Sequence, residues 1–537
     1  MKRIIIALAL ILGTLATEAQ TRQTASPDNL SALMPMPNRV EQQKGRPFRL
    51  IEGRTAISYA GDSLEFVAHT LAGIIERRTG VRVGTEAQGK RAAITLSIDS
   101  SLLGDEHYRI EVTHRGIALS GSTAAALFRG AMTIDQLLMG DIVATARNEV
   151  SPIVIDDAPR FGHRAIMLDP ARHFLPVEDV KFFIDQMAKY KYNVLQLHLT
   201  DDQGWRVAIH SHPRLASPQH YTQEELRDIV AYAAQRHIEV IPEVDIPGHT
   251  VAILAAYPEL SCAHLTSDTV IVGKTTNRMV CAANAKSYEV LTDVIGELAA
   301  LFPSPYIHLG GDEAAVPANW AQCERCQAMM RERGYTKATE LMTPFFDRIL
   351  QAVREQGKKA ILWCELDNIY PPANDYLFPY PKDVTLVTWR YGLTPTCQRL
   401  THEHGHPLIM APGEHAYLDY PQWRGDLPEF NNWGMPLSTL ENCYKLDPGY
   451  GRPADEQSHI LGVMGTLWGE AIKDINRATY MAFPRALALA EAGWTEMPQR
   501  DWPSFKERMY PNLTDLMKCG VSVRVPFEVG ERRNPKQ

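Results

Sequence analysis

The chain has 537 residues and a formal net charge of −8, from 55 basic and 63 acidic residues. This length exceeds that of one ordinary domain, so the sequence predicts at least two. The charges form no basic stripe, which argues against a nucleic-acid-binding protein, and no nucleic-acid partner is expected.

The N-terminus has the pattern of a signal peptide. A short basic segment (residues 2–3) precedes an almost unbroken apolar run (residues 4–12). The small residues Thr17 and Ala19 predict cleavage after Ala19, which makes residues 1–19 the signal peptide. An apolar run of about a dozen residues is too short to span a bilayer comfortably. We therefore expect an exported protein, periplasmic or secreted, with no membrane span in the mature chain.

Residues 30–157 are predicted to form a small α+β domain. Apolar and polar positions alternate in three segments, at 91–100, 108–121 and 151–157. This alternation is typical of strands in a sheet with one exposed face. Helical patterns occur at 65–80 and 124–138. Strands with interspersed helices indicate the α+β class.

From residue 160 the sequence changes to short apolar runs separated by amphipathic helical stretches. Eight such runs lie at 164–171, 193–200, 238–245, 306–313, 359–366, 384–389, 407–413 and 462–470. Buried strands that alternate with helices indicate a parallel sheet covered by helices. At this length we expect a closed (β/α)8 TIM barrel over residues 160–510. Residues 511–537 are predicted to be a C-terminal tail.

The cysteines are too few for a disulfide scaffold. Cys262 and Cys281 bracket a polar loop and are candidates for a disulfide in an oxidising compartment. Cys323 and Cys326 form a C-x-x-C motif with no second copy. A local disulfide or two free thiols is favoured there over a zinc site.

Nearly every predicted strand ends in acidic, histidine or tryptophan residues. These are Asp169 and Arg172, Asp201 and Asp202, Asp245 and His249, Asp312 and Glu313, Trp363 and Glu365, Trp389, and Trp468 and Glu470. Barrel active sites lie at the C-terminal ends of the strands, so we expect these residues to converge on one mouth. Tryptophan faces stack on sugar rings, and carboxylates and arginine bind hydroxyl groups. The set therefore indicates a sugar site, with no metal or cofactor implied.

Residues 308–313 read HLGGDE and place Asp312 and Glu313 side by side at a strand end. Glycosidic cleavage needs a general acid and usually a second carboxylate on the other side of the sugar. Two neighbouring acids approach from one side, so the nucleophile is expected to come from elsewhere.

HLGGDE resembles the His-x-Gly-Gly-Asp-Glu signature of glycoside hydrolase family 20, the β-N-acetylhexosaminidases. Other stretches resemble the family in the same order: MLDPARHF (167–174), YKYNVLQLHLTDDQGWR (190–206), PEVDIPGHT (242–250), AYLDY (416–420), TLWGE (466–470) and PRALALAEAGW (484–494). The first domain resembles the small α+β domain that often precedes this barrel. A bare GGDE also occurs in the GGDEF signature of nucleotide cyclases, but no Phe follows Glu313.

The resemblance implies an exo-acting, retaining enzyme that removes terminal non-reducing β-linked GlcNAc or GalNAc from glycans or glycoconjugates. The carbonyl oxygen of the substrate's 2-acetamido group would attack the anomeric carbon and form an oxazoline. Glu313 would be the general acid, and Asp312 would hold the acetamido N–H. Adjacent like charges are expected to keep Glu313 protonated beside an ionised Asp312.

The same resemblance implies roles for nine further residues. Tyr417 would bind the acetamido carbonyl, and Asp201 and His249 would form a relay that tunes Glu313. The implied substrate-binding residues are Arg172, Asp419 and Glu470 for hydroxyl groups, and Trp363, Trp389 and Trp468 for the walls of the acetamido pocket.

Alternatives remain for several residues. Trp363 and Trp389 also fit a barrel core, and His249 also fits a turn. Asp202 and Arg206 are expected to serve local structure, and Glu243 and Asp245 to line the barrel or contact His249. Trp423 and Trp433 are candidates for the leaving-group side, and HEHGH at 402–406 is expected to be the approach to a strand. Two other functions also compete: a family member that releases a disaccharide (lacto-N-biosidase-like) or a sulfated GlcNAc, and a non-catalytic glycan-binding barrel.

Overall fold

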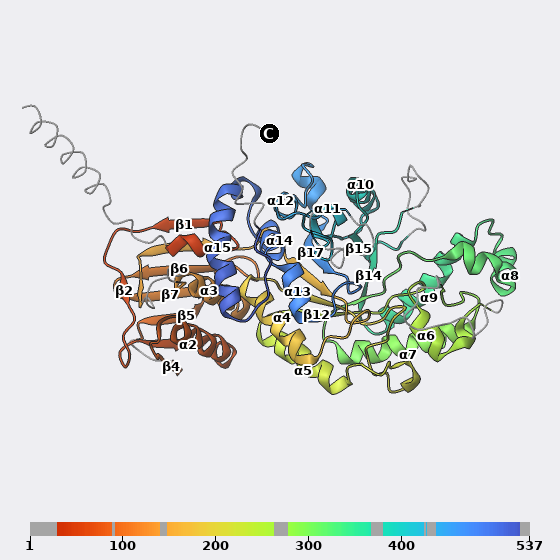
Figure 1. The fold of residues 1–537 in the computed structure, drawn as a ribbon, viewed down its shortest axis with the longest axis horizontal. Helices are drawn as coiled ribbons and strands as arrows, with labels where there is room; N and C mark the ends of the chain where they lie inside the picture. Colours follow the sequence, from red (N-terminus) through yellow and green to blue (C-terminus); the bar gives the residue numbers. More distant parts are fainter. Residues whose placement is uncertain are drawn as a thin grey trace, which may run out of the picture.

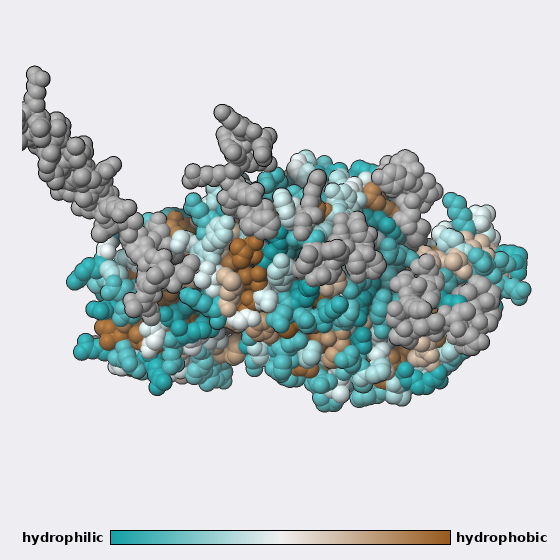
Figure 2. All heavy atoms as spheres, in the orientation of Figure 1, coloured by the Kyte–Doolittle hydropathy of each residue, from teal (hydrophilic) through white to brown (hydrophobic). Residues whose placement is uncertain are grey.

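The computed structural model describes residues 29–87, 92–139, 148–262, 278–366, 380–423, 426 and 436–526. They form a sheet domain and a closed barrel that lie side by side (Figure 1). Within these ranges no helix is long and apolar enough to cross a membrane. The face in Figure 2 is mostly hydrophilic, with apolar residues in small groups. The predicted signal peptide lies outside the described residues.

The first domain is built on a seven-stranded mixed sheet. In spatial order its strands are β1 (Arg39–Gln42), β9 (Ile153–Asp157), β6 (Tyr108–Thr113), β7 (Gly116–Gly121), β5 (Ile94–Ile98), β3 (Ala56–Tyr59) and β4 (Gly84–Ala87). A separate pair joins β2 (Phe48–Arg49) to β8 (Glu149–Val150). Burial alternates along β6, as the sequence predicts. Helices α2 (Glu65–Thr79) and α3 (Ala124–Leu137) pack on the sheet (Figure 1), which confirms the α+β class.

The second domain is the predicted (β/α)8 barrel. Its parallel strands are β10 (His163–Leu168), β11 (Val194–His198), β12 (Glu239–Glu243), β13 (Tyr306–His308), β14 (Lys359–Trp363), β15 (Thr385–Thr388), β16 (Leu408–Met410) and β17 (Ile460–Leu467). The sheet closes because β17 pairs with β10. Apolar side chains such as Met167, Ile241 and Met464 fill the interior. The barrel is therefore a packed core whose functional groups lie at its rim.

Helices surround the barrel. The longer ones are α4 (Val177–Lys189), α5 (Gln223–Gln235), α7 (Ala285–Leu301), α8 (Glu324–Arg333), α9 (Met342–Glu355), α10 (Thr394–His404), α13 (Ile475–Ala482) and α14 (Arg485–Trp494). Short helices α6 (Val251–Ala256), α11 (Gly413–Ala416) and α12 (Leu440–Tyr444) lie in the connections. A capping box at Thr222 and Glu225 fixes the start of α5.

The HEHGH segment is not a strand approach, so that expectation is wrong. His402 and His404 form the last turn of α10, and the helix ends at Gly405, whose φ is 77°. Glycine adopts this left-handed conformation without steric cost, so Gly405 can end the helix at this point. Strand β16 then begins at Leu408.

Buried ion pairs hold the two domains together. Glu106 of the first domain accepts hydrogen bonds from Arg129 of α3 and Arg164 of β10, each at 2.7 Å. Burial raises the pKa of Glu106, but the two guanidinium groups outweigh it and lower the pKa to about 2. Asp157 similarly pairs with Lys191 at 3.1 Å. These charges are buried together, so loss of one partner would leave another uncompensated.

Helix α15 (Trp502–Lys518) crosses the predicted boundary at residue 510. It lies between the sheet domain and the barrel (Figure 1). Its Arg508 donates to the Leu33 carbonyl at 2.8 Å and pairs with Glu491 of α14 at 2.8 Å. The segment after the barrel thus packs as part of the domain interface.

Candidate active site

The strand ends bring the predicted site residues to one rim of the barrel. Arg172 follows β10, Asp201 follows β11, His249 follows β12, Asp312 and Glu313 follow β13, Trp363 ends β14, Trp389 follows β15, Tyr417 and Asp419 follow β16 and α11, and Trp468 and Glu470 follow β17. This edge is the C-terminal face, where barrel enzymes hold their active sites.

Two glycines set the position of the acidic pair. Gly310 and Gly311 have φ values of 66° and 97°. A Cβ on Gly310 would lie 1.8 Å from Asp245 Oδ1, and the Gly311 N–H donates to that same oxygen at 3.2 Å. Strand β13 therefore stops at His308, and the chain turns sharply so that Asp312 and Glu313 follow at the rim.

His249 lies between these acids and Asp201. Its Nδ1 donates to Asp201 Oδ1 at 3.2 Å, and its Nε2 lies 3.6 Å from Glu313 Oε2 and 3.8 Å from Asp312 Oδ2. Burial lowers the pKa of His249, but Asp201 and Asp245 outweigh it and raise the pKa well above its usual value. The imidazole is therefore held as a cation among carboxylates.

Asp312 and Glu313 differ in their surroundings. Asp312 is 6% exposed, and its Oδ1 has no hydrogen-bond partner among the described residues. The Glu313 side chain is 54% exposed. Burial raises the pKa of Asp312, whereas the contact with His249 lowers the pKa of Glu313. Both shifts act against the expected order, in which Glu313 is the more readily protonated of the two, because burial acts on Asp312 and the cation acts on Glu313.

Asp201 is fixed by cations. Arg172 Nη1 lies 2.7 Å from Asp201 Oδ2 and 3.1 Å from Asp169 Oδ2. Burial raises the pKa of Asp201, but Arg172 and His249 outweigh it and hold the pKa well below its usual value. The remaining side of Arg172 faces Glu470, with Nη2 at 3.8 Å from Oε1. A fixed, charged guanidinium beside a carboxylate can bind neighbouring hydroxyl groups.

Aromatic side chains line the same rim. The ring centroids of Trp363 and Trp468 are 5.6 Å apart, and those of Tyr417 and Trp468 are 6.5 Å apart. Asp419 is close to Glu470: burial raises the pKa of Asp419, and the charge of Glu470 raises it further. Trp363 is 1% exposed and belongs to the packed barrel interior, whereas Trp389 and Trp468 are half-buried.

Glu243 has a larger part in the site than its sequence position indicates. It does not contact His249; it accepts hydrogen bonds from Trp363 Nε1 at 2.9 Å and Gln196 Nε2 at 2.7 Å, and pairs with His198 at 3.0 Å. Burial raises the pKa of Glu243, but neighbouring histidines lower it to about 2. This buried carboxylate fixes Trp363 beneath the rim, a role that its partners on β11 and β14 reveal only once the strands are assembled.

Glu365 and Arg390 form a second pair that the sequence analysis did not assign. Arg390 donates to Glu365 at 2.5 Å and lies over the Trp389 ring, with Cζ 4.2 Å from its centroid. Burial raises the pKa of Glu365 to about 7 despite Arg390. The pair holds Trp389 in place. Its only sequence signal is the acid after the β14 run and the arginine directly after Trp389.

Asp202 and Arg206 serve local structure. Asp202 accepts the Val251 N–H at 3.1 Å at the start of α6. Arg206 donates to the carbonyl groups of Pro170 and Ala171, each at 2.8 Å. Trp423 is 38% exposed at the surface. Trp433, the other candidate for the leaving-group side, lies outside the described residues.

Three groups of acidic and histidine side chains at or beneath the rim have atoms close enough for a metal ion: Asp201, Asp202 and His249; Asp245, His249 and Asp312; and His198, Glu243 and Asp245. Each contains His249 or His198, and burial lowers the pKa of both histidines. The neighbouring carboxylates outweigh burial and raise that pKa well above its usual value, so that the positive charge compensates those carboxylates. We therefore interpret them as an ion-pair network.

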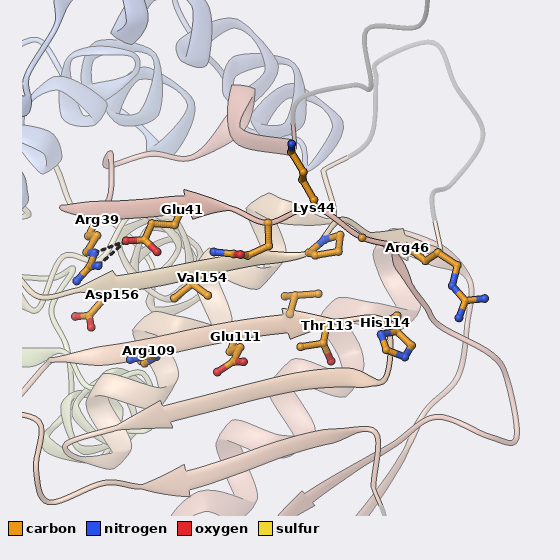
Figure 3. Close-up of a pocket in the computed structure, with 14 residues that line it drawn as sticks. Arg39, Glu41, Lys44, Arg46, Arg109, Glu111, Thr113, His114, Val154 and Asp156 are labelled. Carbon is orange, nitrogen blue, oxygen red and sulfur yellow. Dashed lines mark hydrogen bonds and ion pairs between the residues drawn. The ribbon is translucent and has the colours of Figure 1, made fainter.

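A separate pocket of about 480 Å³ lies on the open face of the first domain, over β1, β6 and β9 (Figure 3). Its side chains are mixed in charge, and Arg39 and Glu41 pair there at 2.5 Å, with 68% and 45% of their side chains exposed. Exposed ion pairs of this kind give little energy or chemistry. The catalytic groups lie at the barrel rim instead.

A closed barrel with paired carboxylates and aromatic walls at its C-terminal rim has the architecture of a glycoside hydrolase. Residues 161–497 match the model described as glycosyl hydrolase family 20, catalytic domain, and residues 30–158 match glycosyl hydrolase family 20, domain 2. The chain belongs to this family and is a glycoside hydrolase.

Similar proteins and solved structures support the same family assignment. A β-hexosaminidase of Akkermansia muciniphila is 37% identical over 434 residues, covering 78% of this chain and 85% of the relative. An exo β-N-acetylglucosaminidase of Vibrio harveyi, solved with N-acetylglucosamine, has a TM-score of 0.80 at 30% identity, covering 93% of this chain and 79% of that one. The N-acetyl-β-hexosaminidase of Streptomyces plicatus has a TM-score of 0.79 at 32% identity, and the match covers 94% of this chain and 98% of that one.

Proposed function

We propose that the protein is an exo-acting, retaining β-N-acetylhexosaminidase that removes terminal non-reducing β-linked GlcNAc or GalNAc. The observation that carries this proposal is the buried Asp312 carboxylate, whose Oδ1 has no partner within the part of the chain that the structure describes, next to the more exposed Glu313. A buried acceptor of this kind needs a donor, and the N–H of a 2-acetamido group is one. Hexosaminidase relatives and a neighbour solved with N-acetylglucosamine support the same substrate class.

In the first step, Glu313 donates its proton to the glycosidic oxygen as the bond to the anomeric carbon breaks. The acetamido carbonyl oxygen attacks that carbon and forms an oxazolinium ring, which Asp312 stabilises through the acetamido N–H. The Tyr417 hydroxyl donates to the same carbonyl oxygen and orients it. The aglycone leaves as an alcohol that carries the proton from Glu313.

In the second step, the Glu313 carboxylate removes a proton from water as the water oxygen attacks the anomeric carbon. The oxazoline ring opens, the acetamido group is restored, and the sugar leaves with its original β configuration. Two displacements at one carbon give net retention. Glu313 ends protonated, ready for the next cycle.

Substrate binding must change the protonation of the acidic pair. The sugar covers the exposed Glu313 side chain and removes water from it, which raises its pKa. The acetamido N–H binds Asp312 and favours its ionised form. His249 is 3.6 Å from Glu313 and hydrogen-bonded to Asp201, so it can exchange a proton with Glu313. The three residues thus form a relay for the proton of the first step.

The remaining rim residues would bind the sugar. Trp363, Trp389 and Trp468 enclose the acetamido methyl group and the ring face. Arg172, Asp419 and Glu470 bind the hydroxyl groups by charge-assisted hydrogen bonds. We also propose that the protein is exported to the periplasm or beyond, on the basic, apolar and small-residue pattern of its first 19 residues.

The test compares an aryl β-glycoside of N-acetylglucosamine with the aryl β-glucoside that has a 2-hydroxyl group. We expect cleavage of the first only, because the second lacks the nucleophile. Equal cleavage would overturn substrate assistance. If neither is cleaved, oligosaccharides with a terminal disaccharide or a sulfated GlcNAc test the other specificities, and binding without turnover on every substrate would refute the catalytic proposal.

A further inference from the structure

Four buried cysteines gather in one cluster in the segments that follow β12 and β13. Cys262 and Cys281 come from the connection between β12 and α7, Cys323 caps the start of α8, and Cys326 lies in its first turn. All four are 0% exposed, and their sulfur atoms all lie within 4.8 Å of one another. Their spacing in the sequence suggests two separate pairs, and only the fold shows that they form one group.

The sulfur separations differ from those of disulfides. Cys281 Sγ is 3.6 Å from Cys326 Sγ and 3.9 Å from Cys323 Sγ, whereas a disulfide needs about 2.05 Å. All eight cysteines are free thiols in the structure, so the candidate disulfide between Cys262 and Cys281 is absent, and Cys323 and Cys326 are free thiols, one of the two states favoured for them. Four thiolates about 2.3 Å from a central ion, at the corners of a tetrahedron, would lie about 3.8 Å apart. The two separations of Cys281 match that arrangement, and all six lie within 4.8 Å.

Positive charge lies close to the cluster. Cys323 and Cys326 lie at the N-terminus of α8, where the helix dipole is positive. Arg325 donates to the Ser261 carbonyl at 2.9 Å, next to Cys262, and its charge acts on Cys281. Cations of this kind surround metal-bound thiolates.

We propose that Cys262, Cys281, Cys323 and Cys326 bind one zinc ion as a closed tetrathiolate site. Thiolate ligands select zinc among the available divalent ions, and four protein ligands leave no position for water or substrate. The site is therefore structural. Binding releases the thiol protons and involves no oxidation or reduction.

The zinc ion would join two loops that carry proposed catalytic residues. The loop with Cys281 is bonded to the His249 turn, because the Val280 N–H donates to the Pro247 carbonyl at 3.2 Å. Trp320, in the segment between Glu313 and Cys323, donates to the Val280 carbonyl at 2.9 Å. The metal thus fixes the His249 loop against the Glu313 loop. This consequence for catalysis rests on the proposed function, whereas the metal site does not.

The first test measures metal and thiol content in the full-length protein, purified without chelator or added metal. We expect about one zinc per chain by mass spectrometry of the elements. The denatured intact mass should correspond to eight reduced cysteines. Metal-free protein with a mass lower by four hydrogen atoms would show two disulfides and overturn the proposal. Metal-free protein with four alkylatable cluster thiols would overturn it as well.

The second test identifies the ligands. Replacement of zinc by Co²⁺ should give the thiolate charge-transfer and visible bands of a tetrahedral cobalt site in the unmutated protein. Spectra of octahedral cobalt would contradict the assignment. Cys326→Ser should retain less than about a tenth of the zinc, whereas Cys443→Ser, which removes a buried thiol outside the cluster, should retain it all. The cobalt spectrum decides the matter if Cys326→Ser does not fold.

Activity separates the two proposals. Removal of zinc should lower kcat on the aryl N-acetylglucosaminide at least threefold, and one equivalent of zinc should restore it. An inactive protein that holds zinc would refute the proposed function and leave the metal site standing. An active protein that holds no zinc would refute the metal site alone.

Discussion

Replacement of Asp312 by Asn tests the role of the buried carboxylate. The change preserves the shape of the side chain and removes its charge. Asp312 is 6% exposed and no described residue hydrogen-bonds to its Oδ1, so the acetamido N–H would meet a desolvated carboxylate. We expect kcat/KM to fall strongly, because the charge is needed most when the oxazolinium ring forms.

The magnitude follows from the surroundings of Asp312. A hydrogen bond to a charged group contributes about 1.5–3 kcal/mol. A preorganised group aimed at transition-state charge contributes about 2.7–4 kcal/mol. Since Asp312 supplies both in one buried position, a loss of about 3–4 kcal/mol is reasonable. This corresponds to a fall in kcat/KM of roughly 100- to 1,000-fold.

The assay is steady-state hydrolysis of the aryl N-acetylglucosaminide across a pH range. Asp202→Asn is the matched control: this buried aspartate accepts the Val251 N–H, which an Asn oxygen can also accept, so less than a tenfold loss is expected. Burial raises the pKa of Asp312. As the pH is lowered, the activity of the unmutated enzyme should therefore begin to fall at a pH above the pKa range usual for aspartate. Asp312→Asn should lose that acid limb. An unchanged rate, or equal losses in both variants, would refute the role of Asp312.

Three further changes test the acid, the turn and the domain interface. Glu313→Gln should lower turnover of natural glycosides by about 100- to 10,000-fold and that of substrates with good leaving groups much less, and equal losses would count against a general acid. Gly310→Ala should abolish activity and lower the melting temperature, because its Cβ would lie 1.8 Å from Asp245 Oδ1; native activity would show that the turn adapts. Glu106→Gln should destabilise the fold by about 3 kcal/mol at pH 7. Because the pKa of Glu106 is lowered to about 2, its contribution is present above pH 4.5 and is lost as the pH falls towards 2. The difference in melting temperature between the unmutated protein and Glu106→Gln should therefore narrow as the pH falls from 4.5 towards 2. A difference that stays constant would contradict the lowered pKa of Glu106.

The sequence predicts the barrel well because each strand is a continuous apolar run, and a parallel strand buried on both faces requires one. It predicts the position of Asp312 because two glycines mark the end of a strand. It overestimates the length of that strand, since the run at 306–313 is apolar up to Leu309 but the strand ends at His308. Backbone turning at Gly310 and Gly311 ends the pairing, and hydrophobicity alone does not show it.

Contacts between distant segments are not readable from local patterns. Glu243 binds side chains from β11 and β14, and the four clustered cysteines come from segments up to 64 residues apart, from Cys262 to Cys326. Which of these meet depends on how the strands close into the barrel. Roles that follow from a strand end were therefore predictable, whereas partners that lie across the barrel were not.

The protonation of the acidic pair shows how the site and the substrate depend on each other. Burial favours a neutral Asp312, and the His249 cation favours an ionised Glu313, which is the reverse of what the first catalytic step needs. In the proposed mechanism a sugar with a 2-acetamido group would correct both, because its N–H would bind Asp312 and its ring would exclude water from Glu313. A sugar with a 2-hydroxyl group supplies no acetamido N–H and no internal nucleophile. In that mechanism the same buried carboxylate would select the substrate and, through its charge, set when Glu313 can act as an acid.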